Sequence, residues 1–324
     1  GRLDEGETSG SQALSIHRPT VARSHCLFNT IVLFWPGAPR DPDMRCPEKE
    51  NALATIFPHD ARRLERSDLT RLVRTRHPGV EVVDFEVLES KTFDAETHEV
   101  STAGRICVDV VLAGEGSASI DRRWMIKVCR PDLGDIPLYR NEVAFYTKLR
   151  PEVDVEAPTC FGGLYERGDD GFAIALEDLR LRNAVFPNVT TPVSIAQMES
   201  LLRTLAKLHA HYWESPRFET DLAWVEPHTS GAIYTMFNHP NMIPAMIAQQ
   251  IEENQFKKEL VEAAGKTAED LYREFRKVQK HQATLPQTLC HGDTHIGNTY
   301  LLPDGSAGLV DWQVPPQQVC DYSN

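Results

Sequence analysis

The stretch Thr288–Trp312, TLCHGDTHIGNTYLLPDGSAGLVDW, says more about the fold and the chemistry of this chain than any other segment. After Asn298 come the short run Thr299–Leu302, the turn residues Pro303-Asp304-Gly305, a second short run and then Asp311. Two runs of this kind around turn residues predict a β-hairpin. Because Asn298 and Asp311 are equidistant from the centre of the turn, we expect the hairpin to bring them side by side.

The residue types in this stretch point to the chemistry of phosphoryl transfer. The amide of Asn298 and the carboxylate of Asp311 are oxygen donors of the kind that Mg²⁺ prefers. His291-Gly292-Asp293 precedes Asn298, and the aspartate and asparagine have the spacing found in the catalytic loop of kinases. Asp293 can accept or orient the proton of an attacking hydroxyl. We therefore predict Asp293 as the catalytic base, with Asn298 and Asp311 as magnesium ligands.

Two other interpretations of the stretch carry less weight. A solvated loop before an ordinary hairpin would explain single residues, but four apt residues at the required spacing favour a site. His291-x-Asp293-x-His295 could also be part of a metallohydrolase ligand cluster. No additional histidine cluster completes such a site, because the side chains of His209 and His211, two residues apart on a predicted helix, point in different directions.

The first half of the chain predicts a small antiparallel sheet with one helix laid on it, preceded by a helix that starts at Ser67. The second half is mainly helical until Thr288 and opens with a capping-box pattern at Ser194, ahead of a stripe that includes Leu202, Leu208 and Tyr212. The fold class is therefore α+β. The predicted strands of the first half are 80–88, 106–112, 123–129, 164–165 and 172–176, and its helix is 138–149.

Lys127 and Glu142 are predicted to form an ion pair. Alternation along the third strand sends Met125, Lys127 and Cys129 to one face. Glu142 lies in an otherwise apolar helical stripe, where a carboxylate is costly unless it is paired. An edge-strand lysine and a solvated glutamate are the simpler alternatives, but in kinases a strand lysine paired with a helix glutamate holds the α- and β-phosphates.

In kinases, a glycine-rich loop between the first two strands covers the phosphates of the nucleotide. The sequence of this chain marks such a loop less clearly. No G-x-G-x-x-G occurs there, and the stretch 91–104 offers Ser101 and Thr102 as donors instead.

The pattern H-G-D-x-H-x-G-N…D-W at 291–312, with LYRNEVAFY at 138–146 and LEDL at 176–179, resembles aminoglycoside phosphotransferases and choline kinases. It looks closest to the ecdysteroid-kinase-like branch and its bacterial relatives. The resemblance covers roughly residues 60–313. It implies a protein-kinase-like bilobal fold that uses ATP and Mg²⁺.

Carried onto the matching positions, the resemblance implies roles for individual residues. Asp293 would be the base, Asn298 and Asp311 the metal ligands, and His291 and His295 the support of the catalytic loop. Lys127 and Glu142 would serve the nucleotide phosphates. Glu177 and Leu179 would form the hinge that meets adenine.

The resemblance also divides the chain. Residues 1–59 are expected to be a poorly ordered extension, 60–179 a nucleotide-binding N-lobe and 180–324 a helical C-lobe. The C-lobe is expected to be incomplete, because only 13 residues follow Asp311 and Pro315-Pro316 opposes a helix. We predict a kinase that phosphorylates a hydroxyl of a small molecule. The alternative is an inactive pseudokinase or a truncated nucleotide-binding fragment.

The composition of the chain limits its binding partners and its cellular location. The net charge of −13 repels nucleic acid. The longest apolar run near the start, Cys26–Trp35, is too short to span a bilayer. Seven cysteines without a Cys-x-x-Cys pair indicate reduced thiols and a cytoplasmic protein. The sequence predicts no oligomeric state.

Overall fold

The computed structural model describes residues 57–91, 101–130, 136–166, 171–188, 190–227 and 229–313, and the backbone of 317–319. The apolar run Cys26–Trp35, and all of the expected N-terminal extension except residues 57–59, lie outside the described residues.

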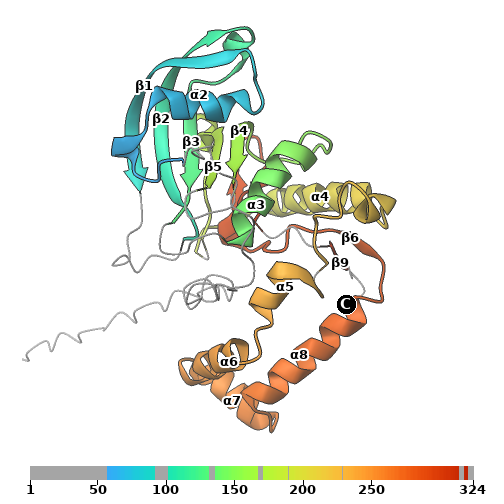
Figure 1. The fold of residues 1–324 in the computed structure, drawn as a ribbon. Helices are drawn as coiled ribbons and strands as arrows, with labels where there is room; N and C mark the ends of the chain where they lie inside the picture. The colour runs from blue at the N-terminus through green and yellow to red at the C-terminus, as the bar shows by residue number, and fades with distance from the viewer. Residues whose placement is uncertain are drawn as a thin grey trace, which may run out of the picture.

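A five-stranded antiparallel sheet forms the first part of the fold, in the order β1-β2-β3-β5-β4 (Figure 1). The runs rich in β-branched and aromatic residues become these strands, as the sequence predicts. The structure extends β1, β2, β4 and β5 beyond their predicted ends. The strands are β1 (Val80–Lys91), β2 (Gly104–Gly114), β3 (Arg123–Val128), β4 (Cys160–Tyr165) and β5 (Phe172–Glu177).

Helix α2 (Arg66–Arg74) covers one face of this sheet and buries Leu69 and Leu72 completely. Its cap is Glu65, not the predicted Ser67. The backbone N–H of Glu65 donates to the Asp68 carboxylate at 3.0 Å, and this reciprocal box starts the helix earlier. Gly162 of β4 permits close packing, because a Cβ there would lie 2.1 Å from the carbonyl oxygen of Leu72.

Helix α3 (Pro137–Ala144) lies on the opposite face of the sheet and continues as a π-helix, Phe145–Leu149. A single α-helix over 138–149 is therefore wrong in its last turn. The N–H of Arg150 donates to the carbonyl of Phe145, five residues back, at 2.9 Å. The wider turn accompanies a close ring contact, since Phe145 stacks on Trp312 with ring centroids 3.8 Å apart.

The second part is mainly helical, and α4 begins with the predicted capping box between Ser194 and Gln197. On α4, Leu208 and Tyr212 are buried as the stripe predicts, but Leu202 is 52% exposed. The helices are α4 (Ile195–Tyr212), α5 (Gly231–Phe237), α6 (Met242–Glu252), α7 (Gln255–Ala263) and α8 (Ala268–Gln282). Two short ribbons follow, β6 (Gln287–Leu289) with β9 (Gln317–Val319), and β7 (Thr299–Leu301) with β8 (Ala307–Leu309). The chain thus has the predicted α+β fold class, with the antiparallel sheet followed by a mainly helical part.

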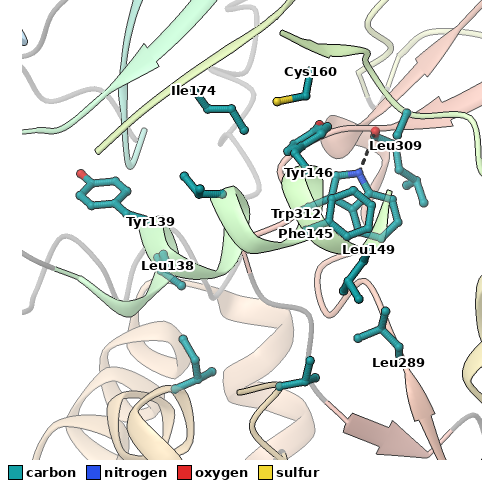
Figure 2. Packing of buried hydrophobic residues seen from close by; sticks show 14 of the residues in the cluster. Leu138, Tyr139, Phe145, Tyr146, Leu149, Cys160, Ile174, Leu289, Leu309 and Trp312 are labelled. Carbon is teal, nitrogen blue, oxygen red and sulfur yellow. Dashed lines mark hydrogen bonds between the residues drawn. The ribbon is translucent and has the colours of Figure 1, made fainter. Parts of the chain in front are cut away.

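One hydrophobic cluster joins the two parts of the fold. It runs from α3 and the sheet to α4 and the short ribbons. Figure 2 shows Phe145 and Trp312 stacked near its centre, with Leu149, Leu289 and Leu309 around them. This shared core holds the stretch that carries Asp311 against the sheet and α3. Within the described residues, no helix has the length and hydrophobicity needed to cross a membrane.

Candidate active site

A cavity of about 440 Å³ lies between the sheet and the β7–β8 hairpin. Four residues singled out by the sequence line it together, namely Lys127, Glu142, Asn298 and Asp311. They come from β3, α3 and the two sides of the hairpin. The expected hinge residues Glu177 and Leu179 also line the cavity.

The predicted ion pair between Lys127 and Glu142 is present. The Lys127 ammonium lies 2.6 and 2.8 Å from the two carboxylate oxygens of Glu142, whose side chain is fully buried. It also donates to Oδ1 of Asp311 at 2.7 Å. Burial opposes the charge on Lys127, but Asp311 and Glu142 outweigh it and raise the pKa of the lysine. Lys127 is therefore an ammonium held by two carboxylates.

The two carboxylates differ electrostatically. Burial raises the pKa of Glu142 despite the nearby Lys127. Burial acts in the same direction on Asp311, but there Lys127 wins and holds the pKa of the carboxyl below its usual value. Asp311 thus remains an ionised oxygen donor beside the cavity.

Gln313 is a residue that the sequence reasoning missed. It is buried, its amide NH₂ donates to Glu142 at 3.1 Å, and its amide oxygen accepts from the hydroxyl of Thr102 at 2.8 Å. The hydroxyl of Thr102, expected to serve the covering loop, is therefore bonded within the protein. Gln313 directly follows Asp311-Trp312, and that position is the only sequence signal for it.

The hairpin register differs from the prediction by one residue. Thr299 pairs with Leu309, and the N–H of Val310 donates to the carbonyl of Asn298 at 2.9 Å, so Asn298 lies opposite Val310 and not Asp311. Neighbouring residues of an extended strand point to opposite faces. Asp311 escapes this alternation because its φ is +65°, in the left-handed region. Its carboxylate therefore still shares the cavity with Asn298.

Asn298 fixes the side chain of Asp293. Its amide nitrogen lies 3.0 Å from the backbone oxygen of Asp293 and 3.0 Å from Oδ2 of the same residue. Both partners are acceptors, so the amide group must present its NH₂ to Asp293. The carbonyl oxygen of the Asn298 amide is then left for another ligand. The side chain of Asp293 is half-buried.

His291 ties the catalytic loop to the strand before Asp311. Its Nδ1 accepts from the backbone N–H of Asp293 at 3.3 Å, so Nε2 must donate to the carbonyl of Val310, 2.9 Å away. Burial lowers the pKa of His291 to about 4, which keeps the ring neutral. Both ring nitrogens are engaged, and this argues against the metallohydrolase interpretation.

His295 lies at the outer edge of the same loop. Its Nδ1 accepts from the N–H of Gly297 at 3.0 Å and caps the 3₁₀ turn Ile296–Asn298. Its Nε2 lies 3.6 Å from Oδ2 of Asp293. His295 is therefore placed to orient both the turn and the aspartate.

At the other end of the cavity the chain leaves β5 at Glu177 and enters the 3₁₀ turn Leu179–Arg182. Here the structure adds a cluster that the sequence did not reveal. The guanidinium of Arg180 binds both oxygens of Asp178 and reaches Glu89 at 2.8 Å. All three residues line the cavity. Their contact links the end of the sheet to the 3₁₀ turn that follows β5.

The strand residues that line the cavity form two rows across the sheet. One row, in cross-strand order, is Glu89, Cys107, Met125 and Leu176. The next row is Lys91, Arg105, Lys127 and Ile174. Residues directly opposite in an antiparallel sheet share a face. The cavity therefore has a mainly apolar row toward the Glu177 end and a cationic row beside Asp311.

Comparison with known proteins places this site in a family. The sequence profile of the phosphotransferase enzyme family matches residues 109–314, which is more than half of the chain. The chain belongs to the phosphotransferase enzyme family. This confirms the aminoglycoside phosphotransferase and choline kinase-like superfamily that the motifs indicated. The ecdysteroid-kinase-like branch within it stays a prediction.

Other comparisons give distant likenesses. No curated protein matches the chain significantly. Several solved structures align with it, and three of them illustrate the low identity. A macrolide 2'-phosphotransferase type I is 15% identical over 78% of this chain and 74% of its own, with a TM-score of 0.35. An AMP-bound spectinomycin phosphotransferase is 14% identical over 79% and 72%, with a TM-score of 0.36. The choline kinase LicA from Streptococcus pneumoniae is 13% identical over 72% and 66%, with a TM-score of 0.31.

Proposed function

We propose that this phosphotransferase moves the γ-phosphoryl group of ATP, with Mg²⁺, to a hydroxyl of a small molecule. One observation carries the proposal. Lys127, paired with Glu142, shares a single cavity with the oxygen donors Asn298 and Asp311. A cation for the phosphates and a pair of metal-binding oxygens are the parts that phosphoryl transfer requires.

The cavity fits a nucleotide in one orientation. We place it between the expected N-lobe, residues 60–179, and the C-lobe, 180–324. The flat apolar base suits the row that contains Met125 and Leu176, beside Glu177 and Leu179, whose backbone groups can meet adenine. The phosphates then extend toward Lys127 and Asp311.

The donor set also fits Mg²⁺. An amide oxygen and an ionised carboxylate are hard ligands, and magnesium takes one or two of these from the protein together with substrate phosphates. Asn298 and Asp311 would hold the ion, and when bound it would neutralise negative charge on the phosphates. Lys127 lies within hydrogen-bond distance of Asp311, so the phosphate and metal positions adjoin.

We assign Asp293 as the group that takes the proton of the acceptor. Its carboxylate is oriented by the amide of Asn298, which ties the base to a proposed metal ligand. A general base must reach the hydroxyl that attacks the phosphoryl group. His291 supports this arrangement by accepting from the backbone N–H of Asp293.

The acceptor class is tested by direct assay. The full chain is incubated with ATP, Mg²⁺ and a panel of aminoglycosides, macrolides, choline-like amines, sterols and sugars. ADP release and phosphorylated products are followed by mass spectrometry. A phosphorylated hydroxyl compound supports the proposal. Nucleotide binding without turnover across the panel, equal to that of Asp293→Asn, would favour the pseudokinase alternative instead.

A further inference from the structure

The cationic row is unusual because three positive side chains lie next to one another. Lys91 of β1 is directly opposite Arg105 of β2, and Arg105 is directly opposite Lys127 of β3. All three line the same cavity. Like charges at directly opposite positions destabilise an antiparallel pair. Such a row calls for a nearby negative charge.

The carboxylates at this end of the cavity serve Lys127. Glu142 and Asp311 both bind its ammonium. The side chain of Arg105, in contrast, makes no hydrogen bond or ion pair in the part of the chain that the structure describes, and it is exposed to the cavity.

Charge counting shows what this arrangement favours. Lys127, Glu142 and Asp311 together carry one net negative charge, so on their own they would repel a polyphosphate. Adding Arg105 cancels this negative charge, so a polyphosphate is no longer repelled at this end of the cavity. An arginine also offers a fork of donors that matches two phosphate oxygens.

A purely protective role for Arg105 does not fit its position. Charged side chains guard the edge strands of sheets against pairing with other chains. β2 is an inner strand, hydrogen-bonded to β1 on one side and β3 on the other. Edge protection therefore does not explain Arg105, and the cavity that its side chain lines offers the better explanation.

We propose that Arg105 is a binding residue for the β- and γ-phosphates of the nucleotide. It makes the site select nucleoside triphosphates over monophosphates. The inference rests on the proposed function, since it assumes that the cavity takes a nucleotide. The inference goes beyond the proposed function because it assigns the discrimination among nucleotides to Arg105 of β2, a position that no motif marks.

The test compares dissociation constants of ATP, ADP, AMP and adenosine by calorimetric titration. The variants are Arg105→Lys, Arg105→Gln and Arg105→Glu, with Arg122→Gln as the matched control, an exposed arginine that does not line the cavity. Loss of one charge-assisted contact should weaken ATP binding ~10-fold in Arg105→Gln. The charge reversal should weaken it further, and Arg105→Lys should give a measurable intermediate loss, because it keeps the charge but not the fork of donors.

The dependence on the ligand separates binding from folding. The loss should fall from ATP to ADP to AMP and vanish for adenosine, which has no phosphate. Equal losses for ATP and adenosine, or an ATP affinity within twofold of Arg122→Gln, would overturn the assignment of Arg105 while leaving the proposed function intact. A wild-type chain that binds none of the four ligands would overturn both. Thermal melts check that each variant is folded. If Arg105→Gln does not fold, the affinities of Arg105→Lys for the four ligands are compared with those of the wild type instead.

Discussion

At the residue scale, Asp293 and Asn298 act as a unit. The amide of Asn298 holds the carboxylate of Asp293, so a change to the base need not disturb the cavity. We predict that Asp293→Asn lowers kcat by on the order of 10²–10⁴-fold, because a general base contributes about that much. The dissociation constant of ATP should stay within a few-fold, since Asp293 does not line the cavity.

Asp304→Asn is the control for this change. Asp304 is an exposed turn residue that accepts from Ser306, and it has no contact with the cavity. It should keep wild-type turnover. Undiminished turnover in Asp293→Asn would remove Asp293 as the base.

His291 gives a prediction for the pH dependence of stability. Burial lowers its pKa to about 4, whereas the unfolded chain titrates near 6.5. Between these values the unfolded state binds a proton that the folded state does not. The free energy of unfolding should therefore fall as the pH drops from 6.5 to 4, by about 3 kcal/mol from this residue.

Urea denaturation at several pH values measures the effect. His291→Gln cannot titrate, so the slope of stability against pH in this window should be shallower than in the wild type, whatever the overall loss of stability. His211→Gln, a more exposed histidine of α4, should keep the wild-type slope. Identical slopes in the wild type and His291→Gln would mean that the ring is protonated in the folded protein.

At the element scale, local patterns predicted strands and helices well but not their detailed geometry. The runs 80–88, 106–112 and 123–129 became β1, β2 and β3 because their residue types favour strands. The hairpin register was wrong by one residue. It depends on how the turn closes and on the left-handed φ of Asp311, which no residue pattern encodes. The π-helix after α3 likewise accompanies packing against Trp312, a residue far away in sequence.

The same contact supports a prediction about stability. Trp312 is fully buried, stacks on Phe145, and donates from Nε1 to the carbonyl of Leu309 at 3.1 Å. Trp312→Leu should lower the free energy of unfolding by ~3 kcal/mol, because it leaves a cavity and an unmatched carbonyl. Trp213→Leu, at a residue that is 47% exposed, should cost under ~1 kcal/mol. Equal losses in denaturant titrations would contradict the shared core as the link between the two parts of the fold.

At the scale of the whole molecule, the site combines segments that are far apart in the chain. The sequence predicted Lys127 with Glu142, because one alternating strand and one helical stripe located both residues. It did not predict the row that contains Arg105, which depends on the register of three strands. Nor did it predict Gln313, whose amide oxygen accepts from Thr102, 211 residues away in the sequence. Polar contacts between distant segments leave no periodic pattern in a sequence.

The described aromatic side chains of the mainly helical second part do not mark a pocket for the acceptor. Trp224 packs on the main core, and Tyr234 lies under the guanidinium of Arg276, 5.2 Å from it. Neither residue lines the cavity between the sheet and the β7–β8 hairpin. The side chain of Phe237 lies outside the described residues. The identity of the acceptor therefore has to be determined by an activity assay.

The account depends most on a metal-dependent nucleotide site at Asn298 and Asp311, and calorimetric titration of ATP with and without Mg²⁺ tests it directly. The wild type should bind ATP at least ~10-fold more tightly with Mg²⁺, since the ion links these oxygens to the phosphates. Asp311→Asn should lose most of this difference, whereas Asp304→Asn should keep it. An ATP affinity that is the same with and without Mg²⁺ in the wild type, or the absence of ATP binding, would contradict the proposed phosphotransferase site.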